Sequence, residues 1–291
     1  MRARITGWDV LVALLVAAGA VWFFYRVEAQ LHYGWNWGVI PQYLFRYDGE
    51  AGGWVPNLLM QGLFNTLRLS VWGILLATLL GTAAGLCRVS RDPFTRLLGR
   101  LYVEFIRNLP PLVLIFLLYY FIGEQIVPGL RLGSWIENLP ETLQGLVILF
   151  FAPPSLLSPF LAGLVTLAIF EGAYIAEIVR AGIQSVERGQ WEAAYSLGLS
   201  RAQTLRRVIL PQAVRRILPP LAGQFISTVK DSAIVSVISI QDLTFQGLEL
   251  MSSTYLTFEI WITVTVLYLF LTLSLSLAVS CLEARLRLGK A

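Results

Sequence analysis

ERGQWEAAYSLGLSRAQTLRRVILPQAVRRILPP, which covers residues 187–220, is the longest polar interval in an otherwise apolar chain. Its first part predicts a short helix over residues 190–197, and Gly198 stands where a left-handed residue commonly ends a helix. The helical repeat places three apolar or aromatic side chains on one face of this helix: Trp191, Ala194 and Tyr195.

A second short helix is predicted over residues 201–208, because Ser200 and Gln203 have the spacing of a capping box. Three apolar side chains line one face of this helix: Ala202, Leu205 and Ile209. Pro211 fits the first turn of a third helix, where its missing N–H would be unpaired in any case. A polar loop with two apolar faces is expected to dock on another surface.

Composition sets the class of protein. Of the 291 residues, 56% are apolar and 14% are charged, and the mean hydropathy is +0.68. A soluble domain, by contrast, carries about 25% charged residues. The sequence therefore predicts an all-α polytopic membrane protein.

The sequence excludes several kinds of chemistry. A single histidine, His32, removes most zinc, haem and histidine acid–base chemistry. Cys87 and Cys281 fall near the ends of predicted spans, so neither a disulfide framework nor a metal site is expected. No G-x-x-x-x-G-K-[ST], H-E-x-x-H or G-x-S-x-G motif occurs, so the chain is predicted neither to hydrolyse ATP nor to be an enzyme. No cofactor, metal or nucleic acid is expected on this chain.

Six membrane-spanning helices are predicted from apolar runs that match the ~20 residues a bilayer core requires. They cover residues 8–25, 58–87, 101–122, 159–181, 214–240 and 258–281. Residues 143–151 are apolar but too short to span, so they are expected to form an interfacial or re-entrant piece. Residues 26–57 are rich in aromatic and turn residues and suit the membrane interface.

Two of these spans carry further signals. The first run could also be a secretory signal, since residues 27–29 loosely imitate a cleavage site, but an uncleaved span agrees better with the more hydrophobic runs that follow. Gly81 and Gly85 are four residues apart in the second run, and this spacing permits a neighbouring helix to approach closely.

Basic residues orient the chain. Sixteen of the 22 Lys and Arg residues fall at the N-terminus, in residues 88–100 and 180–216, and in the C-terminal tail, whereas three fall in the opposite loops. Such an excess in short loops marks the cytoplasmic side of a membrane. Both termini and the polar interval are therefore expected in the cytoplasm.

The polar interval also resembles a known motif. Glu192-Ala193-Ala194, then Gly198, then Ile209-Leu210-Pro211, match the EAA pattern of ABC importer permeases. Further stretches resemble the polar amino acid uptake branch of that family: YVEFIRNLPP (102–111), AYIAEIVRAGI (173–183), GQ (189–190) and KDSA (230–233). The resemblance covers about residues 58–282.

This resemblance implies an architecture and a set of partners. It implies a five-helix permease core over residues 58–282, with an added helix and external loop over 1–57 and a cytoplasmic tail over 283–291. Two permease subunits, identical or homologous, would form the pathway in the bacterial inner membrane. Two ATPase subunits would bind ATP and Mg²⁺ beneath them, and an external binding protein would deliver the substrate. Residues 36–38 and 108–111 look most like permeases for acidic or general amino acids.

The resemblance also implies a role for the polar interval. Within it, residues 187–211 are expected to form coupling helices that lie in a groove of the ATPase. The residues expected at that contact are Gln190, Trp191, Glu192, Ala193, Ala194, Tyr195 and Gly198. The alternative is that they pack only against the ends of the chain's own spans, although buried aromatic residues are what such interfaces use.

Four charged residues near the cytoplasmic ends of two spans have the spacing of ion pairs. Glu104 is expected to pair with Arg107, and Glu177 with Arg180, because residues three apart on a helix are neighbours. A network of this kind would fasten helix ends together near the gate, and it can exchange partners when the helices move.

Glu171 lies near the middle of a predicted span and has no basic residue three or four positions away. It is a candidate for binding the ammonium group of the substrate; alternatively, it is satisfied by Arg68 or Lys230, or is protonated by burial. Arg68 and Lys230 are in turn candidates for the substrate carboxylate, with Asn65 and Asp231 as polar neighbours. For both cations, structural pairing is the stronger interpretation.

Three other functions are alternatives to an ABC permease for amino acids. A self-contained secondary transporter commonly contains inverted repeats, and no convincing repeat is found. A membrane enzyme needs a nucleophile and a base, which the sequence does not offer together. An ABC permease for another small solute would keep the polar loop without the amino acid specificity.

Overall fold

The computed structural model describes residues 7–30, 33–49, 52–123, 125, 129, 136 and 138–288. His32 lies outside these ranges, as do four of the basic residues counted above: Arg2, Arg4, Arg131 and Lys290. The chain divides into two compact units, Met1–Val39 and Ile40–Ala291. The first unit holds α1 (Gly7–Gln30) and a 3-10 turn, η1 (Trp37–Val39).

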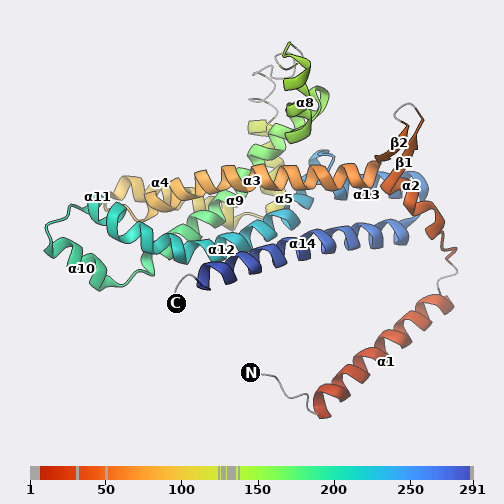
Figure 1. Ribbon diagram of the computed structural model, residues 1–291, viewed down its shortest axis with the longest axis horizontal. Helices are drawn as coiled ribbons and strands as arrows, with labels where there is room; N and C mark the ends of the chain where they lie inside the picture. Colours follow the sequence, from red (N-terminus) through yellow and green to blue (C-terminus); the bar gives the residue numbers. More distant parts are fainter. Residues whose placement is uncertain are drawn as a thin grey trace. The chain divides into compact units, whose positions relative to one another are not determined.

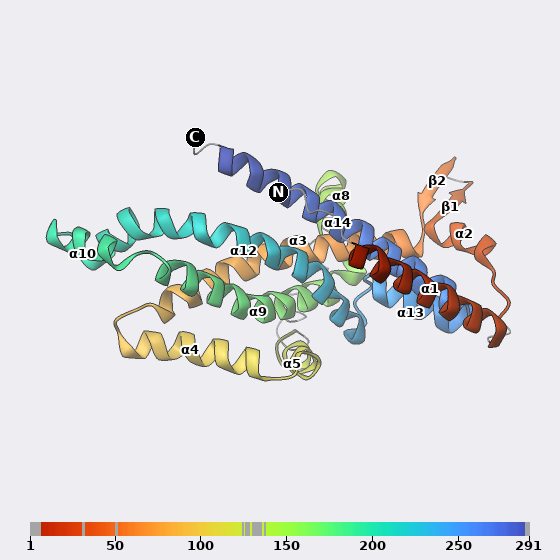
Figure 2. The same ribbon diagram turned by 90° about the horizontal axis from the view of Figure 1, so that it is seen from below.

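Two long helices form the centre of the second unit. α3 (Leu58–Arg88) and α9 (Pro154–Gln184) pack side by side (Figures 1 and 2). They approach closely because Gly81 and Gly85 have no side chains. A Cβ atom at Gly81 would lie 2.6 Å from the carbonyl oxygen of Gly172, and one at Gly85 would lie 2.8 Å from that of Ala176. The close approach predicted from the glycine spacing is confirmed.

The segment after α3 is broken rather than straight. α4 (Pro93–Asn108) and α5 (Pro111–Leu118) belong to a helical pair that is bent by 117°, and α5 continues into a π-helical turn, η2 (Tyr119–Gly123). Leu109 is extended, with ψ of 148°, because a residue before proline avoids the helical region. The span predicted over residues 101–122 therefore corresponds to the end of α4 together with α5 and η2, with a bend between them that was not predicted.

α8 (Glu141–Phe150) is a short helix that projects from the bundle ahead of α9 (Figure 1). The indole N–H of Trp72 on α3 donates to the carbonyl oxygen of Phe150 at 2.9 Å, and its ring stacks on that of Phe151 with 4.7 Å between centroids. The predicted short piece over 143–151 is thus a separate helix whose end is held against α3.

The C-terminal part contributes three more helices. α12 (Leu210–Asp231) packs against α9 and ends in a 3-10 segment, η5 (Ser232–Ile238). α13 (Leu243–Thr254), which the sequence analysis did not predict, is capped by the side chain of Asp242. α14 (Thr257–Leu288) is long and mostly exposed.

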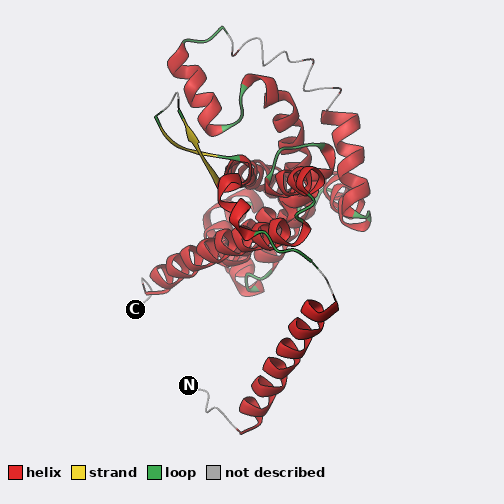
Figure 3. Cartoon of the chain, turned by 90° about the vertical axis from the view of Figure 1, so that its right-hand side faces the viewer, coloured by secondary structure: helices red, strands yellow, loops and turns green. Residues whose placement is uncertain are grey.

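A β-hairpin precedes α3. β1 (Phe45–Asp48) and β2 (Gly53–Pro56) pair antiparallel with Tyr47 opposite Trp54, and they follow the short helix α2 (Ile40–Leu44). This hairpin is the only sheet in the part of the chain that the structure describes (Figure 3).

Within the described ranges, four helical segments are long and apolar enough to cross a membrane: Leu58–Arg88, Glu141–Gln184, Arg201–Ile238 and Thr257–Cys281. The bent pair α4–α5 makes a fifth if it counts as one span. The predicted first span, residues 8–25, corresponds to α1, whose apolar part is the shorter stretch Gly7–Gly19. These segments agree with the predicted all-α polytopic membrane fold.

Candidate functional site

The first predicted helix of the polar interval is α10 (Arg188–Ser196). It ends at Gly198, whose φ of 75° lies in the left-handed region, where a residue with a Cβ atom costs roughly 1–2 kcal/mol. The N–H groups of Gly198 and Leu199 donate to the carbonyl oxygens of Tyr195 (2.9 Å) and Ala194 (3.2 Å), which is a Schellman motif. The helix end is therefore fixed as the sequence predicted.

The second predicted helix begins where it was expected, but it continues into the next helix without a break. α11 (Arg201–Thr204) starts at the capping box, in which the N–H of Gln203 donates to the Ser200 hydroxyl (3.4 Å) and the N–H of Ser200 donates to the Gln203 side chain (2.9 Å). A π-helical turn, η4 (Leu205–Ile209), then joins α11 to α12. The separate third helix predicted to start at Pro211 is thus a continuation, since the wider turn before the proline absorbs its missing N–H.

Packing turns one face of α10 towards the chain itself. Trp191 is half-buried against a cluster that includes Ile183 and Ile209, and Ala194 is buried. The Tyr195 ring lies under the guanidinium of Arg91, 5.7 Å from the ring centroid. Trp191, Ala194 and Tyr195 therefore pack against the chain itself, which was the alternative to their contact with an ATPase.

The opposite face of α10 is open. Gln190, Glu192 and Ala193 are exposed, and Leu197, just after the helix, is 81% exposed. Glu192 pairs with Arg188 at 2.9 Å, a surface ion pair of a kind that contributes about 0–1 kcal/mol and can therefore exchange partners easily. The sequence analysis did not single out Leu197, although an apolar residue directly before a terminating glycine was a usable signal.

Two arginines make contacts at the ends of the loop. The Arg201 guanidinium, at the start of α11, donates to the carbonyl oxygen of Val89 at the end of α3. The Arg216 guanidinium on α12 donates to the carbonyl oxygen of Ser185 at the end of α9. These contacts join the start of α11 to α3 and the start of α12 to the end of α9.

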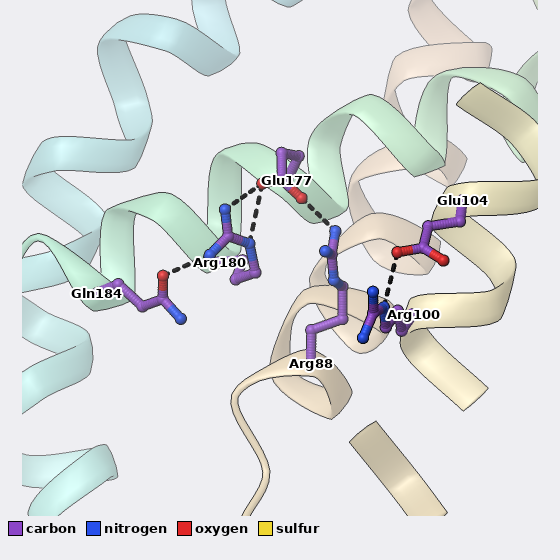
Figure 4. A network of polar contacts seen from close by, with 6 residues as sticks. All are labelled: Arg88, Arg100, Glu104, Glu177, Arg180 and Gln184. Carbon is purple, nitrogen blue, oxygen red and sulfur yellow. Dashed lines mark hydrogen bonds and ion pairs between the residues drawn. The ribbon is translucent and has the colours of Figure 1, made fainter. Parts of the chain in front are cut away.

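Glu177 on α9 is the centre of an ion network near the loop (Figure 4). Its carboxylate accepts from Arg180, one turn further along α9, and from Arg88 at the end of α3; Arg180 also donates to Gln184. The predicted pair of Glu177 and Arg180 is confirmed. The contact with Arg88 joins α3 to α9, and its separation of 89 residues put it beyond sequence reasoning.

The predicted pair of Glu104 and Arg107 is not formed. Glu104 accepts instead from Arg100 at 2.7 Å, on the exposed face of α4 (Figure 4). Arg107 turns towards α9, where its guanidinium stacks over the Tyr174 ring at 5.3 Å from the centroid. Glu104 has an arginine four positions before it, Arg100, and one three positions after it, Arg107, and both spacings allow an ion pair. It pairs with Arg100, because Arg107 contacts an aromatic ring on another helix.

A cavity of about 580 Å³ opens between α4, α9 and α12. Its polar lining comprises Arg107, Tyr174, Glu177, Ser185, Arg216 and Gln224. This volume lies within the range of sites that hold small molecules.

Glu171 is fully buried on α9. Its Oε2 accepts from the side-chain amide of Gln224 on α12 at 2.7 Å, and its Oε1 has no hydrogen-bond partner among the described residues. Thr228 and Asp231, also on α12, lie within interaction range of the same carboxylate. The structure therefore gives Glu171 neither Arg68 nor Lys230 but a second carboxylate.

The other candidates for the substrate pathway are distributed differently. Arg68 donates to the side-chain oxygen of Asn65 at 3.3 Å, and the Asn65 amide donates to the carbonyl oxygen of Gln241 at 2.9 Å. These two residues thus pair structurally between α3 and the segment before α13. Lys230 is exposed in the last turn of α12, whereas its neighbour Asp231 joins Glu171.

One charged residue was missed. Asp242 is buried between the spans, where it caps α13 by accepting from the N–H of Phe245 at 2.8 Å and accepts from the Tyr268 hydroxyl at 3.2 Å. Burial raises the pKa of Asp242 to about 7, despite these hydrogen bonds. An aspartate three residues before the aromatic Phe245 was a capping signal that the sequence analysis did not use.

Comparisons with known proteins agree on one family. The family model described as binding-protein-dependent transport system inner membrane component matches residues 70–288. The probable glutamine ABC transporter permease protein GlnM of Bacillus subtilis is 38% identical over 79% of this chain and 94% of its own length. The glutamate/aspartate import permease protein GltJ of Escherichia coli is 31% identical over 87% of this chain and 96% of its own length.

A solved structure extends this likeness to the fold. The crystal structure of an amino acid ABC transporter with histidines contains a chain that is 38% identical. It aligns with a TM-score of 0.61 over 78% of this chain and 94% of that one.

Proposed function

Because the chain belongs to the binding-protein-dependent transport system inner membrane components and is an amino acid ABC transporter permease, we propose that it carries polar amino acids into the cell, driven by ATPase subunits that dock on the loop of residues 187–209. The substrates named for the relatives above, glutamine and glutamate or aspartate, define the first class to test. The acidic or general amino acids suggested by residues 36–38 and 108–111 overlap with that class.

The proposed orientation places this loop and both termini in the cytoplasm of a bacterium, with the chain in the inner membrane and its spans in contact with lipid. The support is the distribution of basic residues, sixteen on the loop side against three on the other. The hairpin of β1 and β2 then lies on the external side, at the opposite end of α3 from the loop.

Three further chains complete the proposed transporter, besides the soluble binding protein that supplies the amino acid. Two are ATP-binding subunits that hold ATP and Mg²⁺. The third is a second permease subunit, identical or homologous, which forms the pathway together with this chain. ATP hydrolysis belongs to the partner subunits, and this chain acts as a transport subunit.

The observation that carries the proposal is the open face of α10. Glu192, Ala193 and Leu197 are exposed on a helix whose end is fixed by the Schellman motif and whose back is packed on the chain itself. A rigid, partly apolar and unpartnered surface of this kind fits a groove on another protein, and burial of Leu197 would contribute about 1.5–3 kcal/mol. Glu192 can leave Arg188 for a basic group of the partner at little cost.

Closure of the ATPase would move α10 and α11 together. The bond from Arg201 to Val89 passes that movement to α3, and the continuous α11–α12 rod passes it towards the turn that holds Asp231. Glu171 faces Asp231 there, so the movement reaches the proposed substrate site.

Glu171 and Asp231 are the proposed recognition groups for the ammonium of the amino acid. Two carboxylates close together in a buried site favour a cation, and the Oε1 atom of Glu171 has no partner to lose. Gln224 orients the carboxylate through its 2.7 Å hydrogen bond.

The docking proposal is tested by replacing Leu197→Asp and co-purifying the ATPase subunits in mild detergent. We expect at least a tenfold loss of bound ATPase, because a charge would enter an apolar contact. Phe94→Asp is the matched control, since Phe94 is also an exposed apolar residue but lies at the start of α4. If the unchanged chain carries no ATPase with it and none binds on addition, the proposed function is wrong.

The substrate proposal is tested separately by Glu171→Gln in the assembled complex. Uptake of labelled L-glutamine and L-glutamate into proteoliposomes should fall about tenfold, the effect of about 1.4 kcal/mol in affinity for the ammonium group. Unchanged affinity and turnover would remove Glu171 from the pathway while leaving the docking proposal intact.

A further inference from the structure

The cavity between α4, α9 and α12 contains an arginine, Arg107, that forms no ion pair among the described residues. Within the described ranges, no carboxylate lies within 4.0 Å of the Arg107 guanidinium. Glu104, three residues away, is held by Arg100 at 2.7 Å, and Glu177, across the cavity, is held by two other arginines. Arg107 is therefore an exposed cation that lines the cavity near Glu177 without forming an ion pair among the described residues.

Tyr174 holds this cation in a position suited to binding. The guanidinium carbon lies over the Tyr174 ring, 5.3 Å from the ring centroid, so the aromatic ring holds the cation in place. A guanidinium carries five N–H donors in a planar fork. Such a fork can bind a carboxylate through two parallel hydrogen bonds.

The remaining charges of the cavity reinforce the attraction for an anion. Glu177 is neutralised by Arg88 and Arg180, and Arg216 contributes a further positive charge from α12 while donating to a backbone carbonyl. The cavity therefore favours a carboxylate and disfavours an ammonium group.

The cavity also lies next to the buried carboxylates. Gln224 lines the cavity and donates to Glu171 at 2.7 Å, so the same side chain borders both places. Tyr174, three residues beyond Glu171 on α9, lies within electrostatic range of Glu171, Asp231 and Arg107. A negative site and a positive site thus adjoin along one helix.

We infer that Arg107, held by Tyr174, binds the α-carboxylate of an amino acid that is leaving the Glu171–Asp231 site towards the loop end of the bundle. This inference rests on the proposed transport function. It adds a second site of opposite charge, so that the substrate is passed from an ammonium-binding site to a carboxylate-binding site. The ammonium group is repelled by Arg107 and Arg216, and release therefore proceeds with the carboxylate leading.

The experiment measures equilibrium binding of labelled L-glutamine and L-glutamate to the purified, nucleotide-free complex without the binding protein. Unlabelled L-glutaminamide, which keeps the ammonium group and lacks the α-carboxylate, competes in parallel. Three variants are compared with the unchanged complex: Arg107→Gln, Arg107→Lys and Arg100→Gln. Arg100→Gln is the matched control, because it removes a cation from the same helix outside the cavity.

We expect the unchanged complex to prefer the amino acid over the amide by about tenfold, the effect of one lost charge-assisted contact of about 1.4 kcal/mol. Arg107→Gln should abolish that preference, Arg107→Lys should keep part of it, and Arg100→Gln should keep all of it. A merely structural role of Arg107 would weaken binding of both ligands alike.

Two outcomes overturn the inference without touching the proposed function. One is an Arg107→Gln complex that retains the tenfold preference; the other is an unchanged complex that takes up the amino acid in proteoliposomes yet shows no preference for the carboxylate. An unchanged complex that takes up neither amino acid overturns both proposals, and this result separates the two failures.

Discussion

Replacement of Gly81 by alanine tests how closely α3 and α9 must pack. The new Cβ atom would lie 2.6 Å from the Gly172 carbonyl oxygen and 2.7 Å from the Cβ atom of Ile175. Non-bonded carbon atoms prefer about 3.5–4.0 Å, so the helices must separate by roughly 1 Å. Overpacking of this kind costs about 1–3 kcal/mol, and alanine regains about 1 kcal/mol through helix propensity. The net expectation is a destabilisation of about 0–2 kcal/mol.

The same substitution should weaken function through the ion network. Arg88 lies seven residues beyond Gly81, on the face of α3 that meets α9, and it reaches Glu177 only because the helices are close. Separation of the helices lengthens this contact. We therefore expect slower amino acid uptake as well as a lower free energy of unfolding.

The assay is the apparent thermal midpoint of the purified complex in one detergent, measured alongside uptake in proteoliposomes. Gly145→Ala in α8 is the control, because its added Cβ atom would meet nothing within 4 Å. It should stabilise the protein by up to about 1 kcal/mol through helix propensity alone. If Gly81→Ala raises the midpoint as Gly145→Ala does, the close packing of α3 on α9 is not what the structure describes.

Three further predictions concern the loop and the buried aspartate. Ser200→Ala removes the capping box and should cost about 1 kcal/mol, measured as roughly fivefold faster amide exchange in α11; unchanged exchange contradicts it. Arg201→Gln loses the bond to Val89 and should lower uptake per ATP hydrolysed without loss of bound ATPase, whereas Arg206→Gln, an exposed neighbour, should change neither. The pKa of Asp242 is raised to about 7 in the folded state, so its contribution is fully present below the ordinary carboxyl pKa and is lost as pH rises through 7. Asp242→Asn should therefore keep its thermal midpoint between pH 5 and 8, where the unchanged protein loses stability; parallel curves contradict this.

Local signals in the sequence predicted the elements that depend on short-range chemistry. The capping box at Ser200, the left-handed turn at Gly198 and the close packing at Gly81 each follow from one or two residues and their neighbours. The long apolar run that became α3 was also predicted within one residue at its end. Each of these features is determined by residues that are close together in the sequence.

Other features depend on contacts or bends that the spacing of residues in the sequence does not determine. The prolines at 110 and 111 bend the third segment, although its hydropathy reads as one span. Glu104 had arginines both three and four positions away, and only the position of Tyr174 on another helix decides which one it keeps. The capped helix α13 lies in a polar connection whose signal is a single aspartate.

The sequence also could not show which face of α10 is buried by the chain itself. The helical repeat correctly grouped Trp191 with Ala194 and Tyr195, but an amphipathic pattern does not say whether its apolar face meets the same chain or another. The face left open is the one that carries Glu192 and Leu197. Leu197 was not predicted at this face, although it is an apolar residue directly before the terminating Gly198.

The π-helical turn over Leu205–Ile209 gives the chain one place where its length can change. A π turn holds one residue more than an α turn, so deleting a single residue there leaves an unbroken α-helix and preserves the phase of everything beyond it. Deleting a residue further along α12, for instance Ala213, rotates the following part by about 100° and carries Gln224 away from Glu171. Natural variation in length between the loop and the substrate site should therefore concentrate in these five residues, which act as a spacer between two parts that must each keep their own alignment.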